Sequence, residues 1–325
     1  MNAIAFLDLP QIEQRLEKLD VVSLMENAFA AFSRGEAVVP VPGELLIQDP
    51  PGEVHIKYGY FKTSETYVIK IASGFWNNPA KGLSSSDGLL LVFKKETGEL
   101  AAVLNDRGRL TDLRTAAAGA VAAKHLGPMD VDVIGVIGTG IQAELQVQLL
   151  QTVHPCRNIV VWGRNAERTS DYARRMENKG FFVEIAPAAS AVAARSRLIV
   201  TATASSSPLL QWSDIRPGTH ITAVGADSAE KQELDEAIIY NADVVVTDSR
   251  TQAISRGELG HAYGQDPSSM SRVAEIGEVV SGAAKGRTHQ DQVTVATFSG
   301  LAVQDIAIAS AVLSQQDDTS GILSD

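Results

Sequence analysis

A regular alternation of apolar strands and helices between residues 131 and 249 constrains the fold of this chain more than any other feature. The expected strands are VDVIGVIG, NIVVWGR, FFVEIA, RLIVTATA, HITAVGAD and ADVVVTDS. Helical patterns lie between them, in IQAELQVQLLQTV, ERTSDYARRMENKG, SAVAARS and QELDEAIIYNA. Continuous apolar strands joined by helices are typical of a parallel sheet covered on both faces. The sequence therefore predicts a doubly wound α/β domain.

The segment before this array has a different texture. Residues 21–33 carry apolar side chains at helical spacing, and Gly35 follows as a stop signal. Strand-like runs then extend from residue 44 to residue 105, and the turn ETGE between two of them predicts a hairpin. These patterns indicate a mostly antiparallel sheet accompanied by a helix, which is an α+β module.

Two further helices define the expected domain boundaries. Residues 111–126 are rich in alanine, with Thr111 or Asp112 as the expected N-cap and Gly127 as the stop. The last helix, LAVQDIAIASAVLSQQ, is expected to return to the first module, before a polar and mobile tail over residues 317–325. We therefore predict an α+β domain over 1–115 with 301–325, and a doubly wound α/β domain over 116–300.

Composition excludes several classes of function. The chain has 325 residues and a formal net charge of −11, which argues against general binding to nucleic acid or to anionic membranes. One cysteine leaves no disulfide framework, and the six histidines show no metal-ligand spacing, so we expect no metal. No run is apolar enough to span a bilayer, and the N-terminus lacks a basic segment followed by an apolar block. We expect a cytoplasmic protein.

The stretch DVIGVIGTGIQAELQ carries the first chemical signal. Gly138 and Gly140 follow a strand and precede a helix, and Ala143 completes a G-x-G-x-x-A pattern. Such a turn lets backbone N–H groups approach a pyrophosphate at a helix N-terminus. At the start of a long alternating array, this pattern predicts a Rossmann-type dinucleotide site, whereas a glycine turn used only for packing is the alternative.

The end of the second strand bears on the choice of cofactor. An acidic residue usually binds the adenosine ribose there, but this chain has Gly163 and Arg164. Arginine can hold a 2′-phosphate, which slightly favours NADP(H) over NAD(H), although it can also lie over the adenine or in solvent. The expected cofactor-binding residues are Gly138, Thr139, Gly140, Ile141, Gln142, Arg164, Asn165, Thr203 and Ala204.

Three motifs together carry a resemblance to a known family. The glycine run GVIGTGIQAELQ, the upstream LTDLRTAAAGAVAAKHL and the downstream VGADSAEKQELD resemble the ornithine cyclodeaminase/mu-crystallin family over nearly the whole chain. That family includes ornithine and lysine cyclodeaminases, an alanine dehydrogenase branch, and reductases of α-imino acids. The resemblance implies an NAD(P)-dependent enzyme. It also implies a substrate-binding and dimerisation domain over 1–115 with 301–325, whose sheet forms a homodimer, and a dinucleotide-binding domain over 116–300.

The resemblance also implies roles for individual residues. Lys70 and Arg114 match the family cations that bind the substrate carboxylate, and two such cations suit a carboxylate chemically. Asp227 matches the acid that handles the substrate nitrogen, so Asp227 and Lys70 are the expected catalytic residues. Lys231 matches the family lysine that follows this acid by four residues. Ser85 matches a family hydroxyl near the nicotinamide amide. Singly, each has a plainer reading, such as an N-cap for Asp227.

The chain departs from the cyclodeaminase pattern at two places. Cyclodeaminases have a carboxylate-binding arginine where this chain has Pro42, while His55 and Lys57 stand where relatives tend to have apolar residues. Lys57 can replace the lost charge or receive a second substrate carboxylate; alternatively it is an exposed strand residue. The segment ATFSGLAVQDIA is closer to the alanine dehydrogenase branch. Asp305 within it is expected to cap a helix or pair across the domain junction.

The resulting functional prediction is an NAD(P)H-dependent reductase that converts an α-imino acid to an L-amino acid. The reduction of iminosuccinate to aspartate is one candidate, and the imine of pyruvate and Δ1-pyrroline-2-carboxylate are others. An ornithine-type cyclodeaminase that releases ammonia and recycles its NAD is an alternative. A second alternative is an NADPH-dependent protein that binds a small ligand, as mu-crystallin does.

Overall fold

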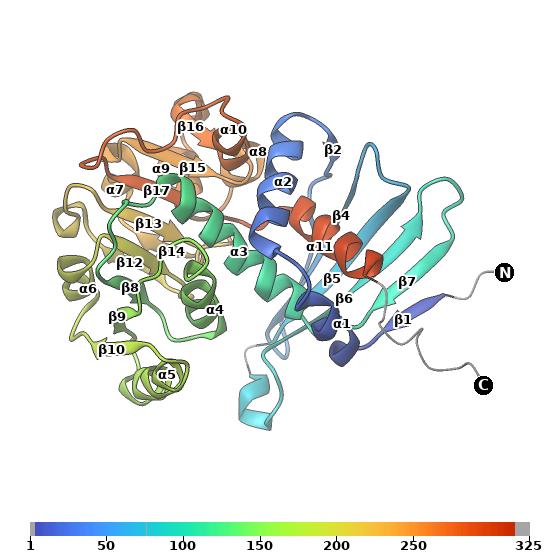
Figure 1. Cartoon of the computed structure of the whole chain (residues 1–325), viewed down its shortest axis with the longest axis horizontal. Helices are drawn as coiled ribbons and strands as arrows, with labels where there is room; N and C mark the ends of the chain where they lie inside the picture. Colours follow the sequence, from blue (N-terminus) through green and yellow to red (C-terminus); the bar gives the residue numbers. More distant parts are fainter. Residues whose placement is uncertain (1–3, 76, 316–325) are drawn as a thin grey trace. The chain divides into compact units, whose positions relative to one another are not determined.

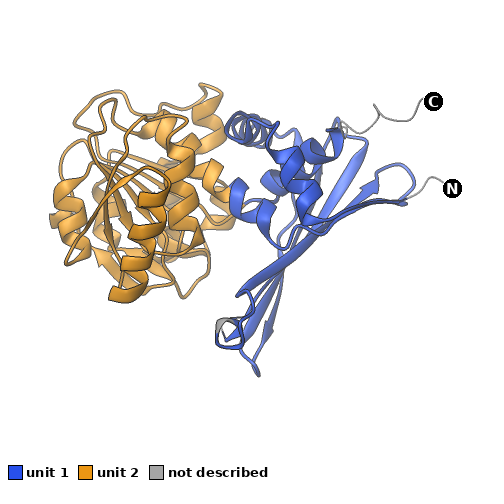
Figure 2. Ribbon diagram, turned by 60° about the horizontal axis from the view of Figure 1, so that its bottom comes forward, with its two compact units in different colours: residues 1–114, 301–325 blue, residues 115–300 orange. Residues whose placement is uncertain are grey.

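The structure is a computed structural model that describes residues 4–75 and 77–315 and consists of two compact units. Unit 1 comprises Met1–Arg114 and Leu301–Asp325, and unit 2 comprises Thr115–Gly300 (Figures 1 and 2). The polar tail expected over residues 317–325 lies outside the described residues. No helix within the described ranges combines the length and the hydrophobicity needed to cross a membrane.

Unit 2 is built on an eight-stranded sheet in which every neighbouring pair is parallel. The strands follow the order β10-β9-β8-β11-β13-β17-β15-β16. Their bounds are β8 (Ile134–Ile137), β9 (Asn158–Trp162), β10 (Phe182–Ile185), β11 (Leu198–Thr201), β13 (His220–Ala223), β15 (Val244–Thr247), β16 (Val273–Glu275) and β17 (Thr294–Thr297). The predicted doubly wound α/β fold is confirmed, and each strand expected from the apolar runs is present.

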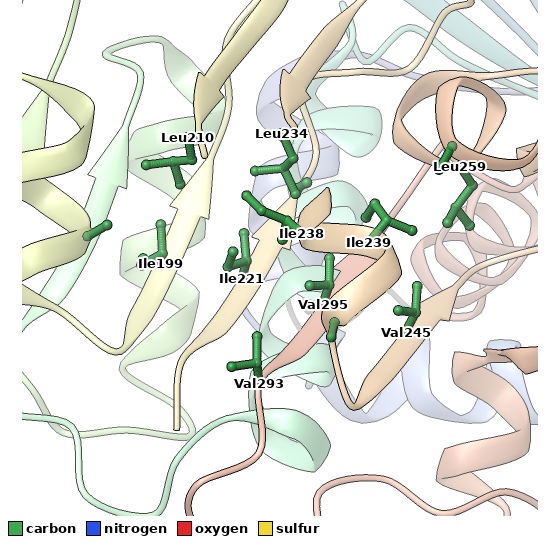
Figure 3. Close-up of a cluster of buried hydrophobic side chains, with 14 of the residues drawn as sticks. Ile199, Leu210, Ile221, Leu234, Ile238, Ile239, Val245, Leu259, Val293 and Val295 are labelled. Carbon is green, nitrogen blue, oxygen red and sulfur yellow. The ribbon is translucent and has the colours of Figure 1, made fainter. Parts of the chain in front are cut away.

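Alternate residues of these strands enter two separate cores because successive side chains of a strand point to opposite faces. Ile199 and Ile221 pack with helices α6 (Ala189–Arg195), α7 (Glu236–Asn241) and α9 (Gly257–Tyr263), as Figure 3 shows. Leu198 and Val200 pack on the other face with helices α4 (Ile141–Leu150) and α5 (Ala166–Asn178). This arrangement explains why the strands are continuously apolar.

The structure corrects the first half of one predicted helix of unit 2. The sequence predicts a helix over the whole of QELDEAIIYNA, but Gln232–Leu234 forms strand β14, which pairs in parallel with β12 (Ser206–Leu210). Helix α7 begins only at Glu236, because the Asp235 side chain accepts a hydrogen bond from the backbone N–H of Ala237 and caps it. The remaining helices of unit 2 are α8 (Arg250–Ala253) and α10 (Ile276–Val280).

Unit 1 is a twisted sheet with helices against one face (Figure 1). The strands β1 (Ala5–Leu7), β2 (Ala37–Val38), β3 (Gly43–Ile47), β4 (Gly52–Phe61), β5 (Thr66–Gly74), β6 (Ser86–Lys94) and β7 (Leu100–Leu104) are antiparallel except for the parallel pair β1–β7. The helices are α1 (Leu9–Leu16), α2 (Val21–Ser33) and α11 (Ala302–Ser314). Both the helix predicted over 21–33 and the β6–β7 hairpin around ETGE are confirmed.

The two faces of this sheet differ in how far their side chains are exposed to solvent. An inner row that crosses the strands at Lys57, Lys70, Leu90, Leu104 and Leu7 is buried, and α11 packs against this face. The neighbouring outer row consists of Tyr58, Ile69, Leu91, Val103 and Phe6. Although this row is apolar, Tyr58 is 38% exposed and Phe6 is 59% exposed. The sheet therefore has one face packed within the unit and one apolar face open.

The long helix α3 (Arg109–Leu126) starts earlier than predicted. The expected N-cap at Thr111 or Asp112 is wrong, because both residues lie inside the helix. The buried Asp106 side chain instead accepts a hydrogen bond from the backbone N–H of Leu110 at 2.8 Å. The helix ends at Leu126, before Gly127, as the sequence predicts.

A buried histidine links two central strands of unit 2. His220 begins β13 and is fully buried, with Nδ1 2.8 Å from Thr294 Oγ1 on β17 and Nε2 2.9 Å from Thr222 Oγ1. Burial, with smaller contributions from Arg287 and His154, lowers the pKa of His220 to about 3. The imidazole is therefore neutral in the folded protein at neutral pH.

We expect His220 to make the protein less stable as the pH falls. In the unfolded chain its pKa returns to about 6.5, so below that pH the unfolded state binds a proton that the folded state does not. The free energy of unfolding should fall by about 2 kcal/mol between pH 8 and pH 5 from this residue alone. Urea unfolding of wild type and His220→Gln at both pH values measures the difference. Equal pH dependence of the two proteins would contradict the prediction, and exposed His289→Gln is the control.

Candidate functional site

The strand order of unit 2 locates the candidate dinucleotide site. From β8 the chain proceeds outward to β9 and β10, then returns to place β11 on the other side of β8. Open α/β sheets bind ligands at such a switch point, beyond the carboxyl ends of the strands. Gly138 follows β8 and Ala202 follows β11, so both residues lie at this edge.

The glycine turn has the shape that a pyrophosphate requires. Gly138 adopts φ +123°, and a Cβ there would lie 2.5 Å from the carbonyl oxygen of Ala202. Gly140 precedes α4 and makes no side-chain cap, and a Cβ at Gly140 would meet no atom within 4 Å. Because no side chain caps α4, an anion could bind the first N–H groups of this helix, and the open space beside Gly140 leaves room for its approach. The residues fit a dinucleotide cofactor, and Thr139, Ile141 and Gln142 belong to the same turn.

The turn after β9 packs directly on this glycine turn. A Cβ on Gly163 would lie 2.6 Å from Thr139 Cγ2, so a side chain there would push the two turns apart. Arg164 is exposed at the next position, where it can reach a ligand. The Asn165 side chain accepts a hydrogen bond from the backbone N–H of Arg168 at 2.9 Å and caps α5. Asn165 thus has a structural role whether or not it also contacts a cofactor.

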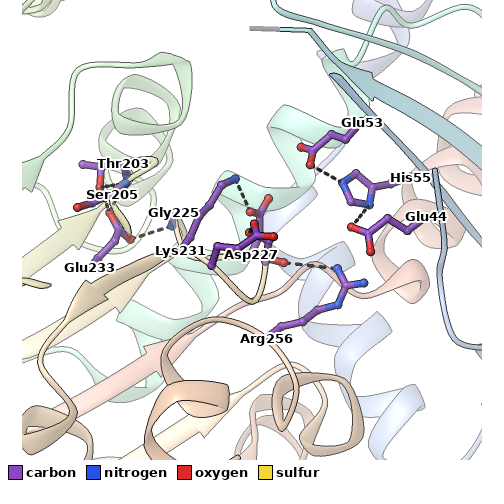
Figure 4. Close-up of polar contacts among 12 residues, drawn as sticks. Glu44, Glu53, His55, Thr203, Ser205, Gly225, Asp227, Lys231, Glu233 and Arg256 are labelled. Atoms are coloured by element: carbon purple, nitrogen blue, oxygen red, sulfur yellow. Dashed lines mark hydrogen bonds and ion pairs between the residues drawn. The ribbon is translucent and has the colours of Figure 1, made fainter. Parts of the chain in front are cut away.

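Two more segments reach the same edge of the sheet. Thr203 and Ala204 follow β11, and Gly225 and Asp227 follow β13. Asp227 is half exposed, and its Oδ1 lies 2.7 Å from Lys231 Nζ (Figure 4). No helix starts at Asp227, since the following element is strand β14, so the plainer reading of this residue as an N-cap is wrong. Its carboxylate lies at the carboxyl edge of the sheet and is paired with Lys231.

Unit 1 contains a buried cluster of charged side chains. Lys57 on β4 and Lys70 on β5 are directly opposed and are 8% and 2% exposed. Asp305 on α11 lies 3.0 Å from Lys70 Nζ and 3.0 Å from Arg114 Nε on α3. All four side chains are buried, so the reading of Lys57 as an exposed strand residue is wrong. The structure brings together Lys57, Lys70 and Arg114, which are far apart in the sequence.

Burial and the neighbouring charges shift the pKa values of the residues in this cluster. Burial lowers the pKa of Lys70 to about 7, and the neighbouring charges of Arg114 and Lys57 add to this effect while Asp305 opposes it. Burial alone would raise the pKa of Asp305, but the charges of Arg114, Lys70 and Lys57 lower it below its usual range. A second acid, Asp106, interacts with Lys70, and burial raises the pKa of Asp106 to about 6. The cluster is thus rich in cations and suited to an anion.

Two residues of this cluster were missed as functional candidates. Asp305 was expected to cap a helix or pair across a junction, but it pairs with two cations inside unit 1. Gln304 accepts a hydrogen bond from Arg114 Nη1 at 3.0 Å and donates one from Nε2 to the carbonyl oxygen of Arg114 at 3.1 Å. The available signal was the polar pair Gln-Asp in the apolar helix LAVQDIAIASAVL, because buried polar residues need partners.

The remaining predicted residues lie elsewhere in unit 1. Ser85 is exposed in the loop before β6, where its carbonyl oxygen accepts a hydrogen bond from the backbone N–H of Phe75. His55 has Nδ1 3.8 Å from Glu44 and Nε2 3.4 Å from Glu53 (Figure 4). Glu44, Glu53 and His55 each offer one atom that could ligate a metal, and these atoms lie within 4.8 Å of one another. Each ring nitrogen faces a different carboxylate, and the expectation that the chain binds no metal stays a prediction.

Comparison with known proteins agrees with this geometry. An uncharacterized cyclodeaminase of Sinorhizobium fredii is 38% identical over 93% of this chain and 92% of its own length. The iminosuccinate reductase of Paracoccus denitrificans is 34% identical over 89% of both chains. An archaeal alanine dehydrogenase dimer with bound NAD superposes with a TM-score of 0.87 at 30% identity, covering 95% of this chain and 94% of the other.

The model of the ornithine cyclodeaminase/mu-crystallin family matches residues 4–320. The match spans both the unit with the buried cations and the unit with the glycine turn. The expectations of an oxidoreductase and of a nicotinamide cofactor are confirmed, whereas the choice between NAD and NADP stays a prediction. The chain belongs to the ornithine cyclodeaminase/mu-crystallin family.

Proposed function

We propose that this protein reduces an α-imino acid to an L-amino acid with NADH or NADPH. One proton is consumed and oxidised cofactor is released, so that each imino acid yields one amino acid. The observation that carries the proposal is the buried cluster of Lys70 and Arg114 around Asp305, in a chain that also has a dinucleotide turn. Two buried cations suit the carboxylate that every α-imino acid carries.

Each residue has a distinct part in this proposal. Lys70 and Arg114 bind the substrate carboxylate, and Asp227 stabilises the protonated imine nitrogen by its negative charge. Lys231, 2.7 Å from Asp227, orients that carboxylate. Because burial lowers the pKa of Lys70 to about 7, Lys70 can also exchange a proton near neutral pH. The nicotinamide, when bound, supplies the hydride.

The position of Lys57 favours a substrate with a second carboxylate. Directly opposed like charges destabilise a sheet, and here Lys57 and Lys70 are opposed and buried. Lys57 is a third buried cation beside Lys70 and Arg114 and could meet a second substrate carboxylate, which supports iminosuccinate, the imine of oxaloacetate, as the substrate. The iminosuccinate reductase of Paracoccus denitrificans belongs to the relatives of this chain. The imine of pyruvate and Δ1-pyrroline-2-carboxylate remain the monocarboxylic candidates.

The proposal extends to the cofactor phosphate. Arg164 is exposed directly after the Gly163 turn and is the residue that could pair with a 2′-phosphate. This placement supports a preference for NADPH over NADH.

We also propose that the protein is a homodimer formed through the outer row of the unit 1 sheet. The row Tyr58, Ile69, Leu91, Val103 and Phe6 is apolar, and its two ends are well exposed. An exposed apolar face of this kind is typical of a subunit interface. The archaeal alanine dehydrogenase that this chain resembles is a dimer.

The proposed activity should be visible as nicotinamide oxidation. We expect loss of absorbance when NADPH, and more weakly NADH, is incubated with enzyme, ammonia and oxaloacetate, with pyruvate, glyoxylate and a cyclic imine tested in parallel. Asp227→Asn should lower kcat by roughly 100-fold or more while leaving cofactor affinity unchanged. The control Asp235→Asn, in the cap of α7, should retain activity. Ammonia release from ornithine without net cofactor oxidation would instead indicate a cyclodeaminase, and tight cofactor binding with no turnover a binding protein.

Lys57 should control selectivity for the substrate side chain. We expect Lys57→Met to raise KM for the imine of oxaloacetate by roughly 10- to 100-fold, since it removes a charge-assisted contact, and to change KM for the imine of pyruvate little. Steady-state kinetics with both keto acids measures this ratio. The exposed Lys62→Met is a matched control. An equal change for both substrates would remove the argument for an acidic side chain.

Assembly can be tested by placing a charge on the outer row. We expect the wild type to have twice the 34.6 kDa chain mass in light scattering, and Tyr58→Glu to shift toward that of one chain, because a buried charge opposes association. Phe182→Glu, at an exposed apolar position of unit 2, should leave the mass unchanged. A monomeric wild type, or a Tyr58→Glu protein that stays dimeric, would contradict the proposed interface.

A further inference from the structure

Unit 2 contains a fully buried carboxylate that no role described above uses. Glu233 lies on β14, and its two oxygens accept four hydrogen bonds. Figure 4 shows its contacts with Thr203 and Gly225. Oε1 accepts from the backbone N–H of Thr203 at 2.6 Å and from its hydroxyl at 2.8 Å. Oε2 accepts from Thr201 Oγ1 at 2.7 Å and from the backbone N–H of Gly225 at 2.9 Å. Two donors at each oxygen complete the acceptor capacity of an ionised carboxylate.

The four donors come from the two segments that carry the candidate site. Thr201 is the last residue of β11 and Thr203 begins the loop with Ala204, whereas Gly225 lies in the loop that leads to Asp227. The two loops also touch each other, because a Cβ on Gly225 would lie 2.2 Å from the carbonyl oxygen of Thr203. One carboxylate thus joins the backbones of both loops beyond neighbouring strands of the sheet.

Burying the Glu233 carboxylate costs free energy of folding, so its presence calls for a role in positioning the two loops. A buried carboxylate loses its hydration, and the four groups that bind Glu233 are neutral. Burial raises the pKa of Glu233 to about 7, although its hydrogen bonds oppose the increase. The neighbouring Glu258 is also buried and accepts hydrogen bonds from the backbone N–H groups of Glu233 and Leu234 at 2.8 and 3.1 Å. Glu258 therefore holds β14, but it does not contact either loop through these bonds.

We propose that Glu233 is a positioning residue that fixes the loop of Thr203 and Ala204 relative to the loop of Asp227. It would thereby set both the cofactor contacts of the first loop and the orientation of the acid in the second. The part that concerns Asp227 rests on the proposed imine reduction, whereas the part that concerns the cofactor does not. Glu233 acts through these backbones rather than on the substrate.

Glutamine distinguishes a positioning carboxylate from a space-filling side chain. Both oxygens of Glu233 accept a backbone N–H, one from Thr203 and one from Gly225. Whichever oxygen is replaced by an NH2 group, a donor then faces a backbone donor that cannot reverse its polarity. Glu233→Gln should therefore move one of the two loops although the side chain keeps its size.

The test compares Glu233→Gln with the matched control Glu258→Gln. Both variants remove a buried acceptor of backbone N–H groups, so both should unfold more easily. Only Glu233→Gln should raise the Kd for NADPH, by roughly tenfold or more in fluorescence titration without substrate, and speed amide deuterium exchange in peptides covering 201–205 and 224–228. Equal Kd values for wild type and Glu233→Gln, or equal increases in both variants, would overturn the proposal.

A milder variant keeps the proposal testable if Glu233→Gln fails to fold. Thr201→Val removes one hydrogen bond to Glu233 and conserves shape, and Thr247→Val changes the buried last residue of β15 as its control. We expect the Kd for NADPH to rise several-fold in the first variant and to stay constant in the second. No difference between them would overturn the proposal. Because cofactor binding is measured without substrate, this outcome is separate from failure of the proposed imine reduction.

Discussion

The ion pairs of Asp305 with Lys70 and Arg114 are the interactions on which the proposed substrate site depends. The two cations lie 3.0 Å from the Asp305 carboxylate in a buried environment, and leaving either cation without a partner there would cost several kcal/mol. The pair holds the helix α11 against strand β5 and keeps both cations in place before any substrate arrives. A carboxylate ligand then meets preorganised charge, which reduces the ordering that binding must otherwise supply.

On the cofactor side, the equivalent constraint is close backbone approach at the carboxyl edge of the sheet. Gly138 lies against the carbonyl oxygen of Ala202, Gly163 against Thr139, and Gly225 against Thr203, so each contact has no room for a Cβ. Four loops, which follow strands β8, β9, β11 and β13, are thereby packed on one another. The parallel order of the strands delivers these loops to the same edge, which is why a fold-level rule for ligand binding applies to this chain.

Sequence patterns predicted the parts of this structure that depend on local periodicity. The apolar runs predicted six strands of the unit 2 sheet, namely β8, β9, β10, β11, β13 and β15, but not β16 or β17. Helical spacing predicted α2, and Gly127 marked the end of α3. The prediction of a helix over the whole of QELDEAIIYNA failed because β14 is only three residues long and pairs with the distant β12. No local sequence pattern reveals such a pairing. The partner of Lys70 lies 235 residues away at Asp305, so the ion pair could be recognised only in the fold. Lys70, Arg114 and Asp227 came from family resemblance, and their roles remain proposals.

The central claim is that hydride passes directly to the α-carbon of an imino acid. The most direct measurement uses NADPH deuterated at the transferred position of the nicotinamide, with oxaloacetate and ammonia, followed by mass spectrometry and NMR of the product. Our account predicts aspartate with one deuterium at Cα. Aspartate without label at Cα, or no aspartate and all of the deuterium retained in the cofactor, would contradict it.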